Sequence, residues 1–159
     1  MIDEEVRAVV LAVIVISAAL SASQAMTAGR VAEAFSAIGI LGPEMKIGDH
    51  PKTVIVGEPF NLYVYIENQE GRTMYYTVLA KVGNNSTAVN ETAPAGLEPF
   101  AAYRSILAHG QNATIPVEIS LASPAQNAKL IFELWAIGEN GAYYTGRWNH
   151  LWMNVTSLP

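Results

Sequence analysis

The sequence predicts a mainly β protein in which an N-terminal hydrophobic α-helix is followed by an immunoglobulin-like antiparallel β-sandwich. Residues 8–29 contain no charged side chain, which is typical of an apolar helix. After Phe35 the chain becomes rich in β-branched and aromatic residues. Gly, Pro and Asn interrupt this second part roughly every eight to twelve residues, as between the short strands of a sandwich. We therefore expect two parts, residues 1–35 and residues 36–159.

The apolar segment between Arg7 and Arg30 reads AVVLAVIVISAALSASQAMTAG. As a helix it would be about 33 Å long, close to the thickness of the hydrocarbon core of a bilayer. Three interpretations fit it: an uncleaved signal anchor, a cleavable signal peptide, and the buried helix of a filament subunit. Signal peptides begin with basic residues, whereas this chain begins MIDEEVR, although Ser21-Ala22-Ser23 offers a small-x-small cleavage site.

Small residues recur four positions apart on this helix, a spacing that lets helices approach closely in lipid. An Ala-rich helix without such a role would show the same spacing. We expect lipid or neighbouring N-terminal helices around the segment, with self-association or a membrane-protein partner. The sequence VAEAF after Arg30 predicts that the helix continues for a turn or two, before Gly39 and Pro43 stop it. The spaced pairs are Ala18/Ala22, Ser21/Ala25 and Ala25/Gly29.

Composition argues against several classes of function. The net charge is −5 with nine Lys and Arg, which do not cluster into the basic face that nucleic acid requires. The chain has no cysteine, so it has no disulfide, thiolate metal site or Cys nucleophile. Phosphate-binding loops, nucleophile elbows and metal-ligand spacings are missing, and Asp49-His50-Pro51 is typical of a turn. We expect neither an enzyme nor a cofactor.

Alternation along the second part assigns side chains to faces. It places Leu62, Val64 and Ile66 inward with Tyr63, Tyr65 and Glu67 outward. Tyr76, Val78, Ala80 and Val82 are expected inward with Lys81 outward. Leu151, Met153 and Val155 are expected in the core, which leaves Trp152 and Asn154 outward. The predicted strands are residues 36–41, 53–56, 60–68, 74–82, 102–107, 113–121, 129–137, 141–147 and 150–155.

Five of the ten asparagines stand in Asn-X-Ser/Thr triplets, the acceptor sequence for N-glycosylation. These are Asn84, Asn85, Asn90, Asn112 and Asn154. Since glycans are attached on the outer side of the membrane, these triplets predict that the C-terminal domain lies outside and the acidic N-terminus inside.

Aromatic residues gather near the C-terminus, where Tyr143, Tyr144, Trp148 and Trp152 lie within ten residues. Outward aromatic rows bind sugars or partner proteins, although rings can also cover the edge of a sandwich. We predict that Trp148 and Trp152, together with Tyr63 or Tyr65, form an outward surface for a glycan or a neighbouring subunit.

Several stretches carry a family resemblance: an LGP start at Leu41, a VGE strand at Val56, the turn N-x-E-G-R-T at Asn68 and a final LW-x-NV at Leu151. With these motifs, residues 36–156 resemble the archaeal membrane-anchored domain-of-unknown-function family numbered 1616. The pieces GEPFNLYVYIEN and GQNATIPVEIS are also similar to immunoglobulin-like modules of cell-surface proteins. The resemblance implies an extracytoplasmic β domain on a membrane anchor and brings no catalytic residues.

These observations favour a non-enzymatic structural or accessory protein of the cell surface, with one helix in the membrane and a glycosylated domain outside. A pilin-type subunit of an archaeal surface filament is the alternative, because such subunits also join a hydrophobic N-terminal helix to an outer β domain. A carbohydrate- or partner-binding module is a second alternative, and it rests on the aromatic residues.

Overall fold

The computed structural model describes residues 3–28 and 33–158. The chain divides into two units, Met1–Glu33 and Ala34–Pro159. The boundary lies two residues before the predicted one, because Phe35 already belongs to a strand. The expected continuation of the helix through Phe35 is therefore wrong, and Gly29 and Arg30 lie outside the described residues.

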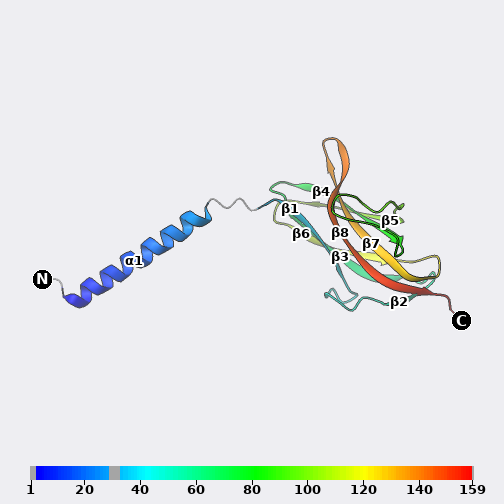
Figure 1. The fold of residues 1–159 in the computed structure, drawn as a ribbon, viewed down its shortest axis with the longest axis horizontal. Coiled ribbons are helices and arrows are strands. Elements are labelled where there is room, and N and C mark those ends of the chain that lie inside the picture. The colour runs from blue at the N-terminus through cyan, green and yellow to red at the C-terminus, as the bar shows by residue number, and fades with distance from the viewer. Residues whose placement is uncertain (1–2, 29–32, 159) are drawn as a thin grey trace. The chain divides into compact units, whose positions relative to one another are not determined.

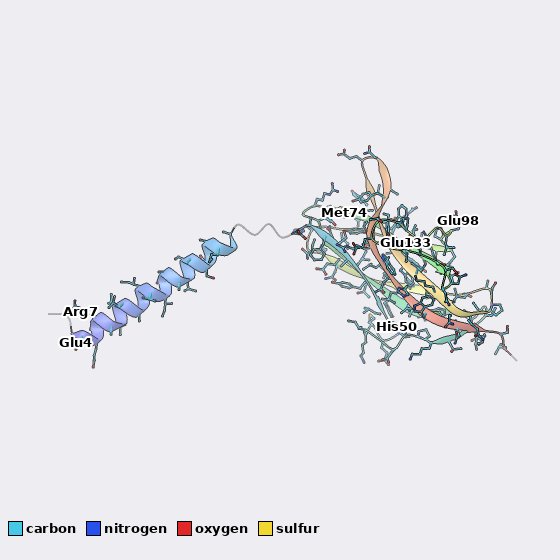
Figure 2. All side chains as sticks on the ribbon, in the orientation of Figure 1. Glu4, Arg7, His50, Met74, Glu98 and Glu133 are labelled. Atoms are coloured by element: carbon cyan, nitrogen blue, oxygen red, sulfur yellow. The ribbon has the colours of Figure 1, made fainter. Side chains whose placement is uncertain are left out.

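The first unit contains one helix, α1 (Glu4–Thr27) (Figure 1). Its apolar side chains project on all sides of the helix (Figure 2). Glu4 and Glu5 occupy the first turn, where negative charge complements the helix dipole. The helix is long and apolar enough to cross a membrane, a property that signal sequences share. A helix that is apolar all round needs lipid or other helices around it.

The second unit is a sandwich of two β-sheets (Figure 1). The three-stranded sheet has the order β1-β3-β6, and the five-stranded sheet has the order β2-β8-β7-β4-β5. The strands are β1 (Phe35–Leu41), β2 (Thr53–Ile55), β3 (Phe60–Gln69), β4 (Met74–Gly83), β5 (Ala101–Leu107), β6 (Asn112–Ile119), β7 (Ala125–Gly138) and β8 (Gly141–Thr156).

All pairings are antiparallel except that of β2, which runs parallel to the end of β8. The chain thus starts in the smaller sheet with β1, crosses to the edge of the larger sheet with β2, and returns with β3. The strand order is that of an immunoglobulin-like sandwich, so the predicted fold class is confirmed.

The core lies between the two sheets and is built by the alternation that the sequence predicted. Leu62, Val64 and Ile66 are fully buried on β3, and Met153 and Val155 are buried on β8. The other core residues include Tyr76, Val78, Ala80, Val117, Ile119, Leu130, Phe132 and Leu134.

Two details of the predicted strands are wrong. The last two predicted strands form a single strand, β8, with a register shift between Tyr144, which pairs with Trp135, and Arg147, which pairs with Leu134. Gly146 lies in this bulge and adopts a φ of 75°. Val82, predicted inward, is 40% exposed and lies one residue before the end of β4.

Candidate functional site

The outer face of the five-stranded sheet is covered by the connection between β4 and β5, residues 84–100, which we call the strap. Lys81 of β4 and Glu133 of β7 point from the sheet toward it and form an ion pair, with 2.8 Å between Nζ and Oε2. The backbone of Ala95 lies against this pair. Its N–H donates to Glu133 Oε1 (2.6 Å) and its carbonyl accepts from Lys81 Nζ (2.8 Å). The indole N–H of Trp135 donates to Glu133 Oε2 (3.0 Å).

Burial confirms that the strap closes over this ion pair. The side chain of Lys81 is 5% exposed and that of Glu133 is 0% exposed. Lys81, predicted outward, does face away from the core, but the strap removes it from water. A buried ion pair whose remaining groups are all hydrogen-bonded avoids an unpaired charge, whereas loss of one partner would leave one.

Further contacts hold the strap along its length. Tyr144 Oη donates to the carbonyl of Asn90 (2.9 Å), and Lys129 Nζ donates to the carbonyl of Thr87 (3.1 Å). Burial, together with the charges of Glu133 and Glu91, raises the pKa of Tyr144 to about 12. The Cα of Gly146 comes so close to the strap that a Cβ there would lie 2.5 Å from the carbonyl oxygen of Glu91. The bulge in β8 therefore provides the space that the strap occupies.

Beside the strap, Trp148, His150 and Trp152 alternate along β8 on the outer face of the same sheet. We call them the aromatic row. The rings of Trp148 and His150 stack with 5.3 Å between centroids, and His150 meets Trp152 edge-on at 5.6 Å. Lys129 Nζ lies 5.6 Å from the centroid of Trp148 and 5.5 Å from that of Trp152, so the protein's own ammonium group occupies the position between the two indoles. Burial and the charge of Lys129 lower the pKa of His150.

Tyr63 and Tyr65 lie on the other sheet, on the outer side of β3. Tyr65 Oη donates to Glu67 Oε2 (2.9 Å), which raises the pKa of Tyr65. The structure therefore brings Trp148 and Trp152 together through His150, but it does not bring either tyrosine to them. Trp152 is 44% exposed, as expected for an outward residue, and Trp148 is half-buried.

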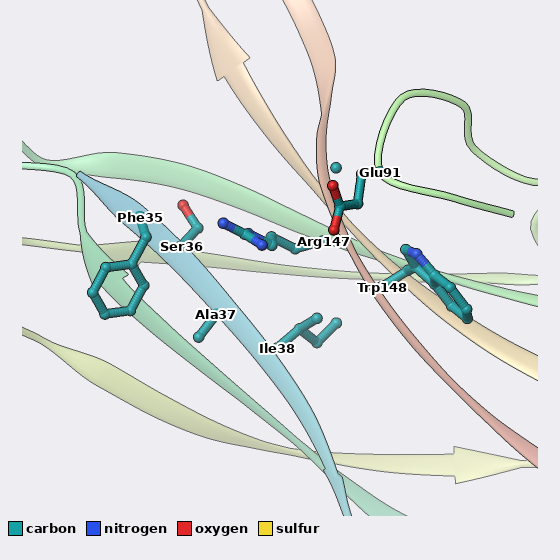
Figure 3. A pocket seen from close by; sticks show the side chains of 8 residues that line it. Phe35, Ser36, Ala37, Ile38, Glu91, Arg147 and Trp148 are labelled. Carbon is teal, nitrogen blue, oxygen red and sulfur yellow. The ribbon is translucent and has the colours of Figure 1, made fainter. Parts of the chain in front are cut away.

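A cleft lies between β1 and β8, with a volume of about 480 Å³. Figure 3 shows Arg147 extending from β8 toward β1, while Trp148 lies on the other side of the β8 ribbon and Glu91 comes from the strap. At the cleft wall, the buried hydroxyl of Ser36 bonds to Tyr76 Oη (2.7 Å) and to Glu70 Oε1 (2.6 Å). The lining residues are Phe35, Ser36, Ala37, Ile38, Glu91, Gly146, Arg147 and Trp148.

All five asparagines of the glycosylation triplets are exposed. Asn84, Asn85 and Asn90 belong to the strap, Asn112 begins β6, and Asn154 lies near the end of β8. Four of the five thus flank or cover the five-stranded sheet, and Asn112 belongs to the three-stranded sheet.

Within residues 3–28 and 33–158, no three His, Asp or Glu side chains come together as metal ligands. Asp49 and His50 lie in the connection between β1 and β2, where Asp49 adopts a φ of 52°. The Nδ1 atom of His50 is buried without a hydrogen-bond partner among these residues.

Sequence reasoning missed the ion pair of Lys81 and Glu133. A signal was present, because Glu133 interrupts the apolar run LIFELWAI and Lys81 is the single charged residue of β4. A carboxylate in the middle of a buried strand needs a cation, since charged groups are buried only when paired. The strap could not be inferred in the same way, because its sequence is that of an ordinary loop.

The chain belongs to the family described as Domain of unknown function (DUF1616), whose model matches residues 29–154. This match confirms the numbered family that the motifs suggested. A comparison with curated proteins finds no match.

Solved structures match the sandwich at low sequence identity. A β-glucosidase from Listeria innocua matches with a TM-score of 0.52 and 11% identity, over 79% of this chain and 16% of the β-glucosidase. The CARDB domain of a Pyrococcus furiosus protein, solved in complex with di-metal ions, matches with a TM-score of 0.47 and 10% identity, over 77% of this chain and 89% of that domain. The chain thus spans about a sixth of the β-glucosidase, and this similarity concerns the fold alone.

Proposed function

We propose that this member of the family is a non-enzymatic structural or accessory protein of the cell surface, anchored by α1 and carrying an N-glycosylated β-sandwich outside the membrane. The observation that carries the proposal is the contrast between the two units. α1 is apolar on all sides, whereas the sandwich has a complete core of its own. The exposure of all five triplet asparagines supports an outer location for the sandwich.

Cell fractionation tests this proposal. The intact chain is expected in the membrane fraction, released by detergent but not by high salt or alkaline carbonate. On whole cells, an added protease is expected to digest the sandwich, and mass spectrometry is expected to find sugar on the triplet asparagines. An intact chain that is soluble in the cytoplasm and carries no sugar at Asn90 or Asn112 would refute the proposal.

A subunit of a surface filament is the second candidate, and a feature of α1 favours it. The side chains of Ala18, Ala22, Ser21 and Ala25 are all exposed, so neighbouring copies of the helix can approach along them. The same faces fit lateral association within a bilayer. Electron microscopy of sheared surface filaments, followed by mass spectrometry, separates the two candidates: a chain that is missing from every such filament is not a filament subunit.

A further inference from the structure

The asparagine triplets differ in how the folded domain holds them. Attachment of a glycan requires that the side-chain Nδ2 and the surrounding backbone leave the protein surface and enter the transferase. A triplet in a strand ladder must first break the hydrogen bonds that join it to the neighbouring strand, whereas a triplet in an exposed loop has only the local hydrogen bonds of its turn and its anchor to release.

The triplet at Asn154 is held by strand pairing and by hydrogen bonds. Asn154, Val155 and Thr156 pair with Thr53, Val54 and Ile55 of β2, and Val155 also pairs with β7. The Asn154 N–H donates to the carbonyl of Lys52 (2.8 Å), and Asn154 Oδ1 accepts from the N–H of Asn127 (3.0 Å).

The triplet at Asn112 is also part of a ladder. Asn112, Ala113 and Thr114 pair with Glu67, Ile66 and Tyr65 of β3, although β6 is an edge strand. Modification of the folded chain at Asn112 therefore requires the start of β6 to detach from β3.

The triplet at Asn90 stands outside all strand pairing, and Asn90, Glu91 and Thr92 are all exposed. Asn90 Oδ1 accepts from the Thr92 N–H (2.9 Å), the Ala93 N–H (2.8 Å) and the Thr92 hydroxyl (2.8 Å). Because two of these partners are backbone N–H groups, the atom that faces them has to be the oxygen, so Nδ2 points the other way. Nδ2 makes no hydrogen bond to any residue that the structure describes, unlike Nδ2 of the buried Asn68, which donates to two carbonyls.

The folded domain also fixes this presentation. Tyr144 binds the carbonyl of Asn90, and the ion pair of Lys81 and Glu133 clamps Ala95 five residues further along. The strap thus holds the Asn90 amide outward while the rest of the loop is anchored to the sheet.

We propose that Asn90 is a glycan acceptor that stays available after the sandwich has folded, whereas Asn112 and Asn154 are modified only before or during folding. This inference rests on the glycosylation in the proposed function. It predicts that the occupancy of each site depends on whether the transferase acts before or after the sandwich has folded.

The test uses the full-length chain produced without glycosylation and purified, folded, in detergent. It is incubated with membranes that contain an oligosaccharyltransferase and its lipid-linked oligosaccharide, and occupancy is measured site by site by mass spectrometry. On the folded chain, we expect occupancy at Asn90 to exceed that at Asn112 and Asn154 by about tenfold or more, the effect of a modest cost of local opening. The same chain offered after denaturation is expected to lose most of this difference.

Two matched variants show whether the glycan detected on the strap is attached at the Asn90 triplet. Thr92→Ala should remove modification of Asn90 alone, and Thr92→Ser should retain it. Equal occupancy of Asn90 and Asn154 on the folded chain overturns the inference while leaving glycosylation intact. If no triplet is modified even on the denatured chain, the inference fails too. Chains isolated from their own cells without any glycan would instead count against the glycosylation in the proposed function.

Discussion

The outer faces of the two sheets follow the same alternation but lead to opposite environments. On β3, Tyr63, Tyr65 and Glu67 face outward and keep contact with water. On β4 and β7, Lys81 and Glu133 also face outward, yet the strap buries them. Alternation therefore decides the side of the sheet on which a residue lies, whereas a loop elsewhere in the chain decides whether that side is wet. On the uncovered sheet, hydrogen bonds from Gln69 and Tyr65 lower the pKa of Glu67, whose carboxylate stays open to solvent.

The largest effect is expected from breaking the buried pair. Lys81→Met leaves the Glu133 carboxylate buried without its cation, which we expect to destabilise the sandwich by about 3–5 kcal/mol. Adding Glu133→Leu should recover part of this loss, because no unpaired charge then remains. Urea unfolding of the full chain in detergent, followed by tryptophan fluorescence, measures both, since every tryptophan lies in the sandwich.

The exposed pair of Lys46 and Glu44, with 3.0 Å between its charged atoms, provides the control. Lys46→Met is expected to cause no measurable change, as is usual for ion pairs in water. If Lys81→Met proves as mild as Lys46→Met, the strap does not exclude water from the ion pair.

The next effect concerns the space beneath the strap. Gly146→Ala places a methyl group against the carbonyl of Glu91 and also strains a left-handed backbone, so we expect a loss of about 2–3 kcal/mol in unfolding free energy. Gly110→Ala is the matched control, because Gly110 has a φ of 77° but open space around its Cα. The control should lose only about 1 kcal/mol from backbone strain. If Gly146→Ala and Gly110→Ala lose the same unfolding free energy, the strap moves away from the added methyl group without destabilising the domain.

A smaller effect is expected on the aromatic row. Trp152→Ala removes an exposed ring and its contact with the Lys129 ammonium group, so thermal stability should change by about 1 kcal/mol or less. The same substitution should weaken binding of a glycan or neighbouring subunit if the row serves one. Tyr63→Ala on the uncovered sheet is the comparison: loss of binding there, with none at Trp152, would move the binding surface to the three-stranded sheet.

The smallest effect is a pH dependence. Because burial and Lys129 lower the pKa of His150, the unfolded chain takes up a proton at a higher pH than the folded one. The unfolding free energy should therefore fall as the pH drops below the ordinary histidine value of 6.5, toward the lowered pKa of the folded state. His150→Gln should reduce this slope, measured by urea unfolding between pH 7.5 and pH 5. If His150→Gln leaves the pH dependence of the unfolding free energy unchanged, folding does not lower the pKa of His150.

The sequence was sufficient for the fold wherever one physical rule dominated. The uncharged run after Arg7 predicted α1, and strict alternation in NLYVYIEN predicted the buried and outward sides of β3. The prediction was wrong near the C-terminus, where it divided residues 141–155 into two strands. The structure has one strand there, β8, which contains a bulge at Gly146, with a φ of 75°.

The candidate site was less predictable, because it depends on contacts between distant residues. Alternation assigned Trp152 to the outer face, but Trp148 lay between two predicted strands, and only the continuous strand β8 places both on the same side. Tyr63 and Tyr65 belong to the other sheet, and only strand order, which one sequence does not specify, separates them from the tryptophans. The burial of Lys81 depends on the hydrogen bonds to Ala95, which no local pattern announces.

The parallel pairing of β2 with β8 has a mechanical consequence. The sandwich begins at Phe35 at one end of β1, and β8 ends at Thr156, next to Ile55 of β2. Tension applied between these two points pulls β8 along its own axis past β2 and β7, so the hydrogen bonds of the ladder are loaded together rather than opened one after another. Val56 N–H to Thr156 carbonyl (2.9 Å) and Asn154 N–H to Lys52 carbonyl (2.8 Å) extend this ladder at both ends. A domain tethered at its first strand and pulled at its last therefore resists extension by shear.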